Sequence, residues 1–175
     1  MPIVPDDKNW TWVLDEVCPE CGYDAATVDL SRMPELVGAN ADAWTAVLAR
    51  PDVARRPSDD RWSALEYGCH VRDVFALFVE RLELMLDTDA PRFENWNQDD
   101  TAIAQRYHLQ DPAKVSRELV AAAERNAACW TRVGDDQWDR TGERSDGALF
   151  TVDSFARYFL HDPVHHLHDV NGSSG

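Results

Sequence analysis

The sequence has little positive charge and no long hydrophobic run. Its 17 Lys and Arg residues face 32 Asp and Glu residues, which gives a formal net charge of -15 over 175 residues. Nucleic-acid and anionic-membrane surfaces both need clustered Lys and Arg, so we expect neither partner. No apolar run approaches the about 20 residues of a membrane-spanning helix. The N-terminus lacks the basic and apolar regions of a signal peptide, so we expect a cytoplasmic protein.

Several motifs of known chemistry are also absent. There is no Gly-rich phosphate loop and no G-x-S-x-G nucleophile elbow, so the sequence favours neither a P-loop nor a serine-hydrolase site. The four cysteines are too few for a disulfide framework in a chain of this size, and we expect reduced thiols. Alternating runs of β-branched residues are scarce, which argues against a β-sheet protein.

What is present favours one packed, all-α domain. Hydrophobic residues make up 44% of the chain and include seven tryptophans, enough for a single core. Apolar residues recur at helical spacing in four segments. These begin near Arg32, Ser63, Asp111 and Thr151. We therefore predict a four-helix bundle over residues 31–170, an irregular extension over 1–30 that packs on it, and a flexible tail over 171–175.

Two helix starts carry recognisable signals. Ser63 and Glu66 have the spacing of a capping box, and Asp111 followed by Pro112 is an N-cap with proline at the first helical position. The link over residues 89–110 is longer than the others. We expect it to carry a short helix or to cover one end of the bundle.

The densest histidine cluster lies near the C-terminus. His161 and His165 are four residues apart, so on a helix they project from one face, as two ligands of one metal ion would. His70, within another helical pattern, is the third candidate, and three protein ligands leave a coordination position open. His168 is a reserve ligand, whereas His166 points about 100° away from His165 and is expected to be a bystander. Ordinary core or surface histidines are the alternative.

Two details near these histidines complicate the prediction. Pro163 lies between His161 and His165, where a kink would change how the second imidazole projects. In the N-terminal segment, Cys18-Pro19-Glu20-Cys21-Gly22 matches half of a zinc site, but no second cysteine pair accompanies it. We interpret it as a turn with two buried thiols, with a separate zinc site and a redox dithiol as the alternatives.

Taken together, these residues resemble a known family. Trp62-Ser63 at a helix start, His70 in the helix that follows, and His161-x-x-x-His165 near the C-terminus are similar to the pattern of the DinB/YfiT-like metalloenzyme superfamily, over residues 32–170. The resemblance implies a four-helix bundle with a long crossover connection. It also implies that His70, His161 and His165 bind a divalent metal, zinc or nickel. Pro163 and the N-terminal thirty residues depart from the family pattern.

The resemblance also implies a class of chemistry. Several members of the superfamily are transferases or isomerases that use a low-molecular-weight thiol such as mycothiol, so we predict a metal-dependent thiol S-transferase with a small-molecule substrate. A non-catalytic metal-binding or ligand-binding protein and a metal-dependent hydrolase are the alternatives. Arg72 and Arg157 are the candidates for a local basic patch that would receive an anionic thiol. We keep a homodimer formed through a helix face as an alternative to a monomer.

Overall fold

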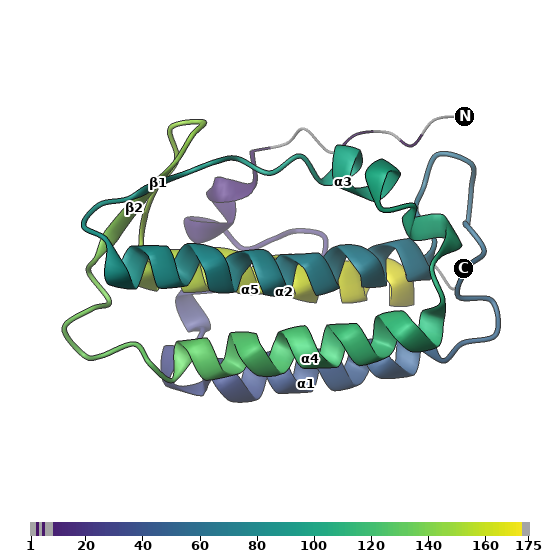
Figure 1. The fold of residues 1–175 in the computed structure, drawn as a ribbon, viewed down its shortest axis with the longest axis horizontal. Helices are drawn as coiled ribbons and strands as arrows, with labels where there is room; N and C mark the ends of the chain where they lie inside the picture. The colour runs from purple at the N-terminus through teal and green to yellow at the C-terminus, as the bar shows by residue number, and fades with distance from the viewer. Residues whose placement is uncertain (1–2, 4, 6–8, 173–175) are drawn as a thin grey trace.

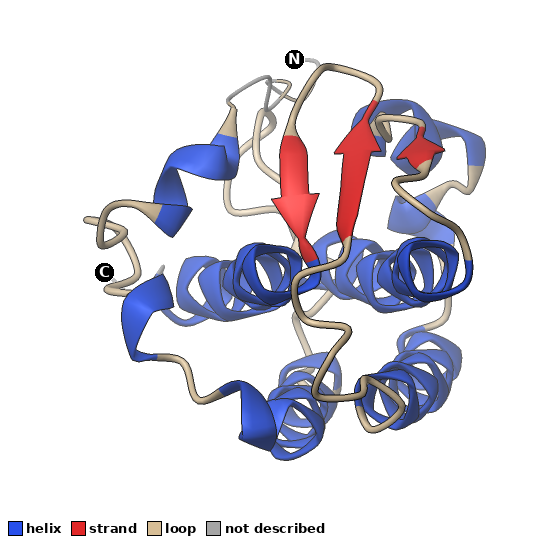
Figure 2. Cartoon of the chain, turned by 90° about the vertical axis from the view of Figure 1, so that its left-hand side faces the viewer, coloured by secondary structure: helices blue, strands red, loops and turns tan. Residues whose placement is uncertain are grey.

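Four long helices form the bundle: α1 (Met33–Leu48), α2 (Ala64–Asp87), α4 (Pro112–Trp130) and α5 (Val152–Gly172). The structure, a computed structural model, describes residues 3, 5 and 9–172. α4 packs against α1 and α2, and α5 packs against α2 and α1, so the helices close a ring. Figure 2 shows the four helices end-on. The predicted all-α four-helix bundle is confirmed.

The helix starts follow the sequence signals. Ser63 Oγ accepts a hydrogen bond from the Glu66 backbone N–H, and the Glu66 carboxylate accepts one from the Ser63 backbone N–H. Asp111 Oδ1 accepts from the Lys114 backbone N–H at 2.8 Å, with Pro112 at the first helical position. These bonds satisfy backbone donors that the first turn of a helix leaves without partners. The capping box therefore fixes the start of α2, and its Glu66 lies one turn before His70.

A small sheet, which the sequence pattern did not predict, lies beside α2 and α5 at one end of the bundle (Figure 1). Its strands β1 (Arg92–Phe93), β2 (Thr141–Arg144) and β3 (Leu149–Thr151) pair in that order, β1 with β2 parallel and β2 with β3 antiparallel. Strands of two to four residues are too short to display an alternating pattern. Gly142 allows the close packing, because a Cβ there would lie 2.9 Å from Met85 Cγ and 3.0 Å from Phe93 Cε1.

The link between α2 and α4 contains β1, the short helix α3 (Gln98–Ala104) and the 3₁₀ turn η4 (Tyr107–Leu109). Figure 1 shows this teal link running beside α2 along much of the bundle. It crosses from the sheet at one end to the start of α4 at the other. The expectation of a short helix in this link is therefore met.

The N-terminal segment contains three 3₁₀ turns, η1 (Trp10–Leu14), η2 (Ala25–Thr27) and η3 (Leu30–Arg32). All three contact α5, and η3 also contacts α1 (Figure 1). At the other terminus α5 extends to Gly172, so the predicted flexible tail is helical in its first two residues. Residues 173–175 of that tail lie outside the described residues.

Helix α5 joins the core to the polar cluster of histidines. Its first half buries Phe155 and Phe159 completely, against Phe78 and Trp130. The helix then continues without interruption through Pro163, which is buried. Proline lacks an N–H, so one hydrogen bond of the helix is lost there. The packing of these aromatic residues therefore also sets the directions in which the side chains from His161 to Asp169 project.

Candidate metal centre

Helix α5 carries two potential ligand pairs, offset by one residue. His161 and His165 form one pair, and Asp162 and His166 form the other, each at a spacing of four residues. One residue of an α-helix is a rotation of about 100°, so the two pairs face different surroundings. The structure describes a separate group of potential metal ligands around each pair.

The first group, which we call the His–Asp–His cluster, contains His70, Asp162 and His166. His70 Nε2 lies 3.2 Å from Asp162 Oδ1, and His166 Nε2 lies 3.7 Å from the same oxygen. Ligand atoms about 2.0–2.1 Å from a tetrahedral zinc ion lie about 3.4 Å from one another. The observed separations therefore fit a cation held between the three side chains.

Neighbouring side chains fix the imidazoles of this cluster. His166 Nδ1 lies 2.9 Å from Asp169 Oδ2, the contact by which a carboxylate orients a histidine ligand. His70 is fully buried, and its ring stacks on Trp96 with centroids 5.3 Å apart and an interplanar angle of 8°. Tyr67 lies beside His166, with a centroid separation of 4.8 Å. Trp96 thus holds the imidazole of His70, and Tyr67 and Asp169 hold that of His166.

The electrostatics of this cluster keep Asp162 ionised. Burial by itself raises the pKa of this carboxyl, but His70 and His166 outweigh that effect and lower the pKa well below its usual value. A carboxylate must be deprotonated to bind a metal. Two imidazole nitrogens and one carboxylate oxygen suit zinc or nickel, and three protein ligands leave a coordination position for a substrate or for water.

The second group, which we call the Cys2His2 cluster, contains Cys18, Cys21, His161 and His165. Cys18 Sγ lies 3.6 Å from His165 Nδ1. The other nitrogen of His165, Nε2, faces Glu20 at 3.5 Å and Asp169 at 3.8 Å. All the cysteines are free thiols.

Protonation in the second group follows from burial. Burial, together with the neighbouring His165, lowers the pKa of His161 to about 4, so its imidazole is neutral at pH 7. Burial raises the pKa of the Cys21 thiol to about 11. His161 Nε2 is buried and has no hydrogen-bond partner among the described residues. An unpaired buried polar atom costs about 1–3 kcal/mol unless something binds it.

The predicted metal ligands are therefore divided between the two groups. Among the described residues, no group whose ligand atoms all lie within 4.8 Å contains His70, His161 and His165 together. His70 lies with Asp162 and His166, and the predicted pair lies with the two cysteines. The reserve ligand His168 is exposed and belongs to neither group.

Sequence reasoning passed over Asp162 and treated His166 as a bystander. A signal was available, because Asp162-x-x-x-His166 repeats the spacing of His161-x-x-x-His165 one position later. Spacing predicts that the members of a pair share a face but does not say which pair faces α2. The candidate ligands that lie beside Cys18 and Cys21 are the predicted histidine pair itself, over 140 residues away.

A cavity of about 640 Å³ lies against both groups. Asp162 and His166 line it from the first group, and His161 and His165 line it from the second. Trp10, Trp62 and Trp96 contribute aromatic walls, and Tyr158 contributes a phenol. A pocket of this size holds a small molecule, and it gives such a molecule access to Asp162 and His166 of the His–Asp–His cluster.

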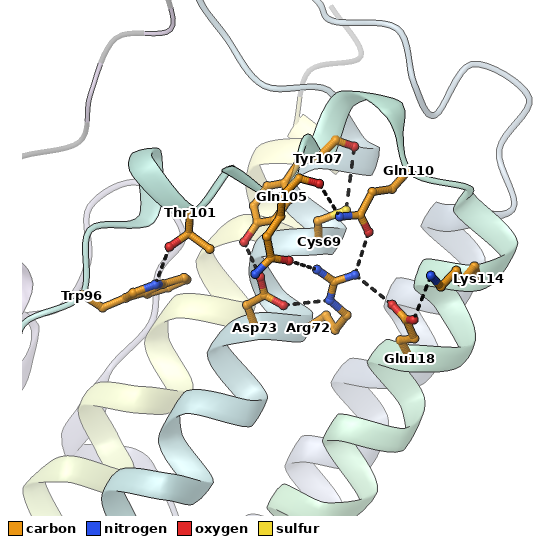
Figure 3. Close-up of polar contacts among 10 residues, drawn as sticks. All are labelled: Cys69, Arg72, Asp73, Trp96, Thr101, Gln105, Tyr107, Gln110, Lys114 and Glu118. Atoms are coloured by element: carbon orange, nitrogen blue, oxygen red, sulfur yellow. Dashed lines mark hydrogen bonds and ion pairs between the residues drawn. The ribbon is translucent and has the colours of Figure 1, made fainter. Parts of the chain in front are cut away.

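The two arginines proposed as a basic patch have other partners. Arg72 donates hydrogen bonds to Asp73, Glu118, Gln105 and Gln110, at 2.7–3.0 Å (Figure 3). Figure 3 shows this network tying α2 to the end of the α2–α4 link and to α4. Tyr107 completes it by donating to Asp73. Arg72 therefore has a structural role there.

Arg157 is engaged in the same way. Its guanidinium donates to Asp153 at 2.7 Å and to the carbonyls of Ala25 and Val28 at 2.6 and 3.1 Å. These bonds fasten the N-terminal segment to α5. Neither arginine lines the cavity.

A different positively charged side chain, that of Arg81, lines the cavity. Arg81 is 6% exposed and lines the cavity, where its guanidinium packs over the rings of Phe78 and Phe93. It donates to the Glu94 carbonyl at 2.7 Å but forms no ion pair with any described residue. Burial and the nearby Arg144 lower its pKa to about 10, so it remains charged at pH 7. Arg144 is paired with Asp146 at 2.8 Å.

The fold and the two clusters define a four-helix-bundle protein with candidate metal-ligand groups beside a pocket. Residues 35–170 match the model of the DinB superfamily, and the chain belongs to this superfamily. Among solved structures it is similar to YfiT from Bacillus subtilis, described as a probable metal-dependent hydrolase with an unusual four-helix bundle topology. That likeness has a TM-score of 0.72 at 16% identity and covers 83% of this chain and 85% of the other.

One further comparison and one property of the helices complete the description. No curated protein matches the chain significantly. Within the described part of the chain, no helix is both long and apolar enough to cross a membrane.

Proposed function

We propose that this protein is a metal-dependent enzyme whose divalent cation, zinc or nickel, is held by His70, Asp162 and His166. The observation that carries this proposal is the set of three convergent ligands beside a cavity of about 640 Å³. Such a cation favours the thiolate form of a bound thiol, or lowers the pKa of a bound water, at neutral pH. Asp169 would hold His166 in the ligating orientation.

The reaction we propose is the transfer of a low-molecular-weight thiol, such as mycothiol, to an electrophilic small molecule. The sulfur forms a bond to an electrophilic carbon, the leaving group departs with the electron pair of the broken bond, and the thiol proton passes to solvent. Membership of the superfamily supports a metal-dependent reaction of this kind. The aromatic walls of the cavity suit a substrate with an apolar body.

Arg81 supports a substrate that carries an anionic group. A buried charge normally has a partner of opposite charge, because burial without one is costly. Arg81 has none among the described residues, and it lines the same cavity as Asp162 and His166. We infer that a carboxylate or a similar anion on the thiol or on the electrophile pairs with this guanidinium.

Hydrolysis is the second candidate function. It is favoured by the similar fold of YfiT, which is described as a probable metal-dependent hydrolase. The same three ligands would serve, with water in place of the thiol. The two reactions differ in whether a thiol is consumed.

The test loads the purified chain with zinc or nickel and offers mycothiol, bacillithiol or cysteine together with monobromobimane. We expect conjugation above background that requires the metal and is lost in His70→Ala and Asp162→Asn, but not in His168→Ala. Metal-dependent ester or amide hydrolysis without conjugation would establish the hydrolase instead. Retention of stoichiometric metal at this site in both ligand variants would refute the ligand set.

Arg81 is tested with pairs of electrophiles that differ in one carboxylate. Arg81→Met keeps the length and apolar body of the side chain while removing its charge. We expect the KM of the anionic electrophile to rise about tenfold or more, with little change for the neutral one. Arg55→Met is the matched control, because Arg55 is 79% exposed and lies outside the cavity. Equal effects on both electrophiles would remove the proposed anion contact.

A further inference from the structure

The Cys2His2 cluster lies outside the proposed catalytic site and has a structure of its own. Cys18-Pro19-Glu20-Cys21-Gly22 is a tight turn, in which the Gly22 N–H donates to the Cys18 carbonyl at 2.8 Å. The Cys18 N–H in turn donates to the Tyr23 carbonyl at 2.8 Å. Gly22 adopts a φ of +76°, which glycine accepts without strain. The turn brings both thiols to the two imidazoles of α5.

The separations within the cluster are those of a tetrahedral metal site. Zinc binds sulfur at about 2.3 Å and nitrogen at about 2.0–2.1 Å, so the sulfur and nitrogen ligands of one ion lie about 3.6 Å apart. Cys18 Sγ and His165 Nδ1 are 3.6 Å apart. Ligand atoms of all four residues lie within 4.8 Å of one another.

One atom without a partner and the orientation of one imidazole also point to a metal ion. His161 Nε2 is buried without a hydrogen-bond partner among the described residues. His165 has one nitrogen toward the cysteine sulfur and the other toward the carboxylates of Glu20 and Asp169. A metal-bound histidine ordinarily has this arrangement, with a carboxylate on the nitrogen that does not bind the metal.

We propose that Cys18, Cys21, His161 and His165 bind a zinc ion that has a structural role. Four protein ligands complete a tetrahedral shell and leave no position for a substrate. The ion would fasten the N-terminal segment, far away in sequence, to α5, where η1 already contacts the helix (Figure 1). Trp10 of η1 packs on both imidazoles, with centroid separations of 5.3 and 5.1 Å.

The zinc ion would also shape the pocket. Asn9, Trp10 and Glu20 of the N-terminal segment line the cavity, together with residues of the α2–α4 link such as Trp96. The cavity wall they form depends on the contact between this segment and α5. This site is independent of the proposed reaction, and its presence does not require that the His–Asp–His cluster be catalytic.

The experiment replaces the metal with cobalt in the full-length chain. A thiolate bound to Co²⁺ produces a sulfur-to-metal charge-transfer band, which a site made of two histidines and one aspartate cannot produce. We expect this band in the wild-type protein, a weaker band in Cys18→Ser or Cys21→Ser alone, and its loss when the two substitutions are combined. It is retained in His166→Ala, which disrupts only the other cluster, and in Cys129→Ser, which removes a buried cysteine outside both clusters. The band thus separates failure of this proposal from failure of the proposed function.

A second measurement needs no variant and decides the matter if the cysteine variants do not fold. A mercurial reagent that reacts with thiols, added to the zinc-loaded wild type, releases one zinc ion for every two site thiols, and a colorimetric zinc chelator detects it. Absence of thiol-dependent zinc release, or absence of a charge-transfer band in cobalt-loaded wild type, overturns the proposal. A band that survives Cys18→Ser and Cys21→Ser together also overturns it.

Discussion

The two clusters on α5 use the same helical spacing but differ in what completes them. The His–Asp–His cluster takes its third residue from α2, within the bundle, and has three ligands. The Cys2His2 cluster takes two residues from the N-terminal segment outside the bundle and has four. Three ligands leave a coordination position for chemistry, whereas four close the shell. The number and origin of the additional ligands, rather than the paired residues on the helix, are what would make one cluster catalytic and the other structural.

Both clusters line the same cavity, but their side chains differ in exposure. Asp162 and His166 lie against the cavity that contains Arg81, and Asp162 is 32% exposed. The histidines of the other cluster lie under Trp10 and are at most 6% exposed. Asp169 contacts a histidine of each cluster, at 2.9 Å from His166 and 3.8 Å from His165.

The largest expected effect comes from removing one histidine from each ligand pair in turn. Loss of a residue that only orients a metal ligand weakens metal binding by about 10–100-fold. His166→Ala removes a ligand itself, so it should weaken metal binding at the His–Asp–His cluster by more than this. The thiolate band of bound cobalt should stay unchanged. His165→Ala should weaken or abolish the thiolate band and leave cobalt binding at the His–Asp–His cluster unchanged. The measurement is a cobalt titration followed by absorption. If His166→Ala abolished the thiolate band, the two clusters would be one site.

The second prediction concerns the start of α2, which affects only one cluster. Burial raises the pKa of Glu66, but hydrogen bonds from Arg56 and Ser63 outweigh burial and lower it. Its contribution to stability is therefore present above the pKa of the unfolded chain and is lost as the pH falls through the lowered pKa. Glu66→Gln should cost about 2 kcal/mol at pH 7 and flatten this acid dependence.

Urea denaturation of the metal-free protein across pH measures the effect of Glu66→Gln. Because His70 lies one turn after Glu66, cobalt binding at the His–Asp–His cluster should also weaken, while the thiolate band stays. The control is Glu35→Gln, which removes an exposed carboxylate of α1 that is paired with Arg32. An equal effect of the two variants on stability would contradict the assigned role of Glu66.

The third prediction uses the residue that the clusters share. Asp169→Asn should weaken metal binding at the His–Asp–His cluster by about 10–100-fold, because the carboxylate no longer orients His166. The Cys2His2 cluster should lose less, since Glu20 remains 3.5 Å from His165 Nε2. Competition with a chelator of known affinity measures both sites. Equal losses at the two sites would mean that Asp169 supports them equally.

The smallest effect is expected at His168. This side chain is exposed and belongs to neither group of ligands. His168→Ala should leave metal stoichiometry, the thiolate band and the melting temperature unchanged within error. Loss of one metal ion in this variant would restore His168 as a ligand and contradict the division described above.

Local sequence signals determined the fold and its helix ends. Ser63 with Glu66, and Asp111 with Pro112, act within one turn, so their effect depends on neighbouring residues alone. The small sheet was not predictable in the same way. Its strands pair Arg92 with Glu143 and Thr141 with Thr151, contacts that a pattern of two to four residues does not encode.

By itself the sequence determined that α5 would present pairs of ligands at a spacing of four residues, because that spacing is a property of any α-helix. The tertiary structure alone decided which pair meets His70 and which meets the cysteines. That choice depends on the rotation of α5, which is fixed by the packing of Phe155 and Phe159 in the core. It also depends on the folding of the N-terminal segment onto α5, which brings Cys18 to His165 across 147 residues of chain.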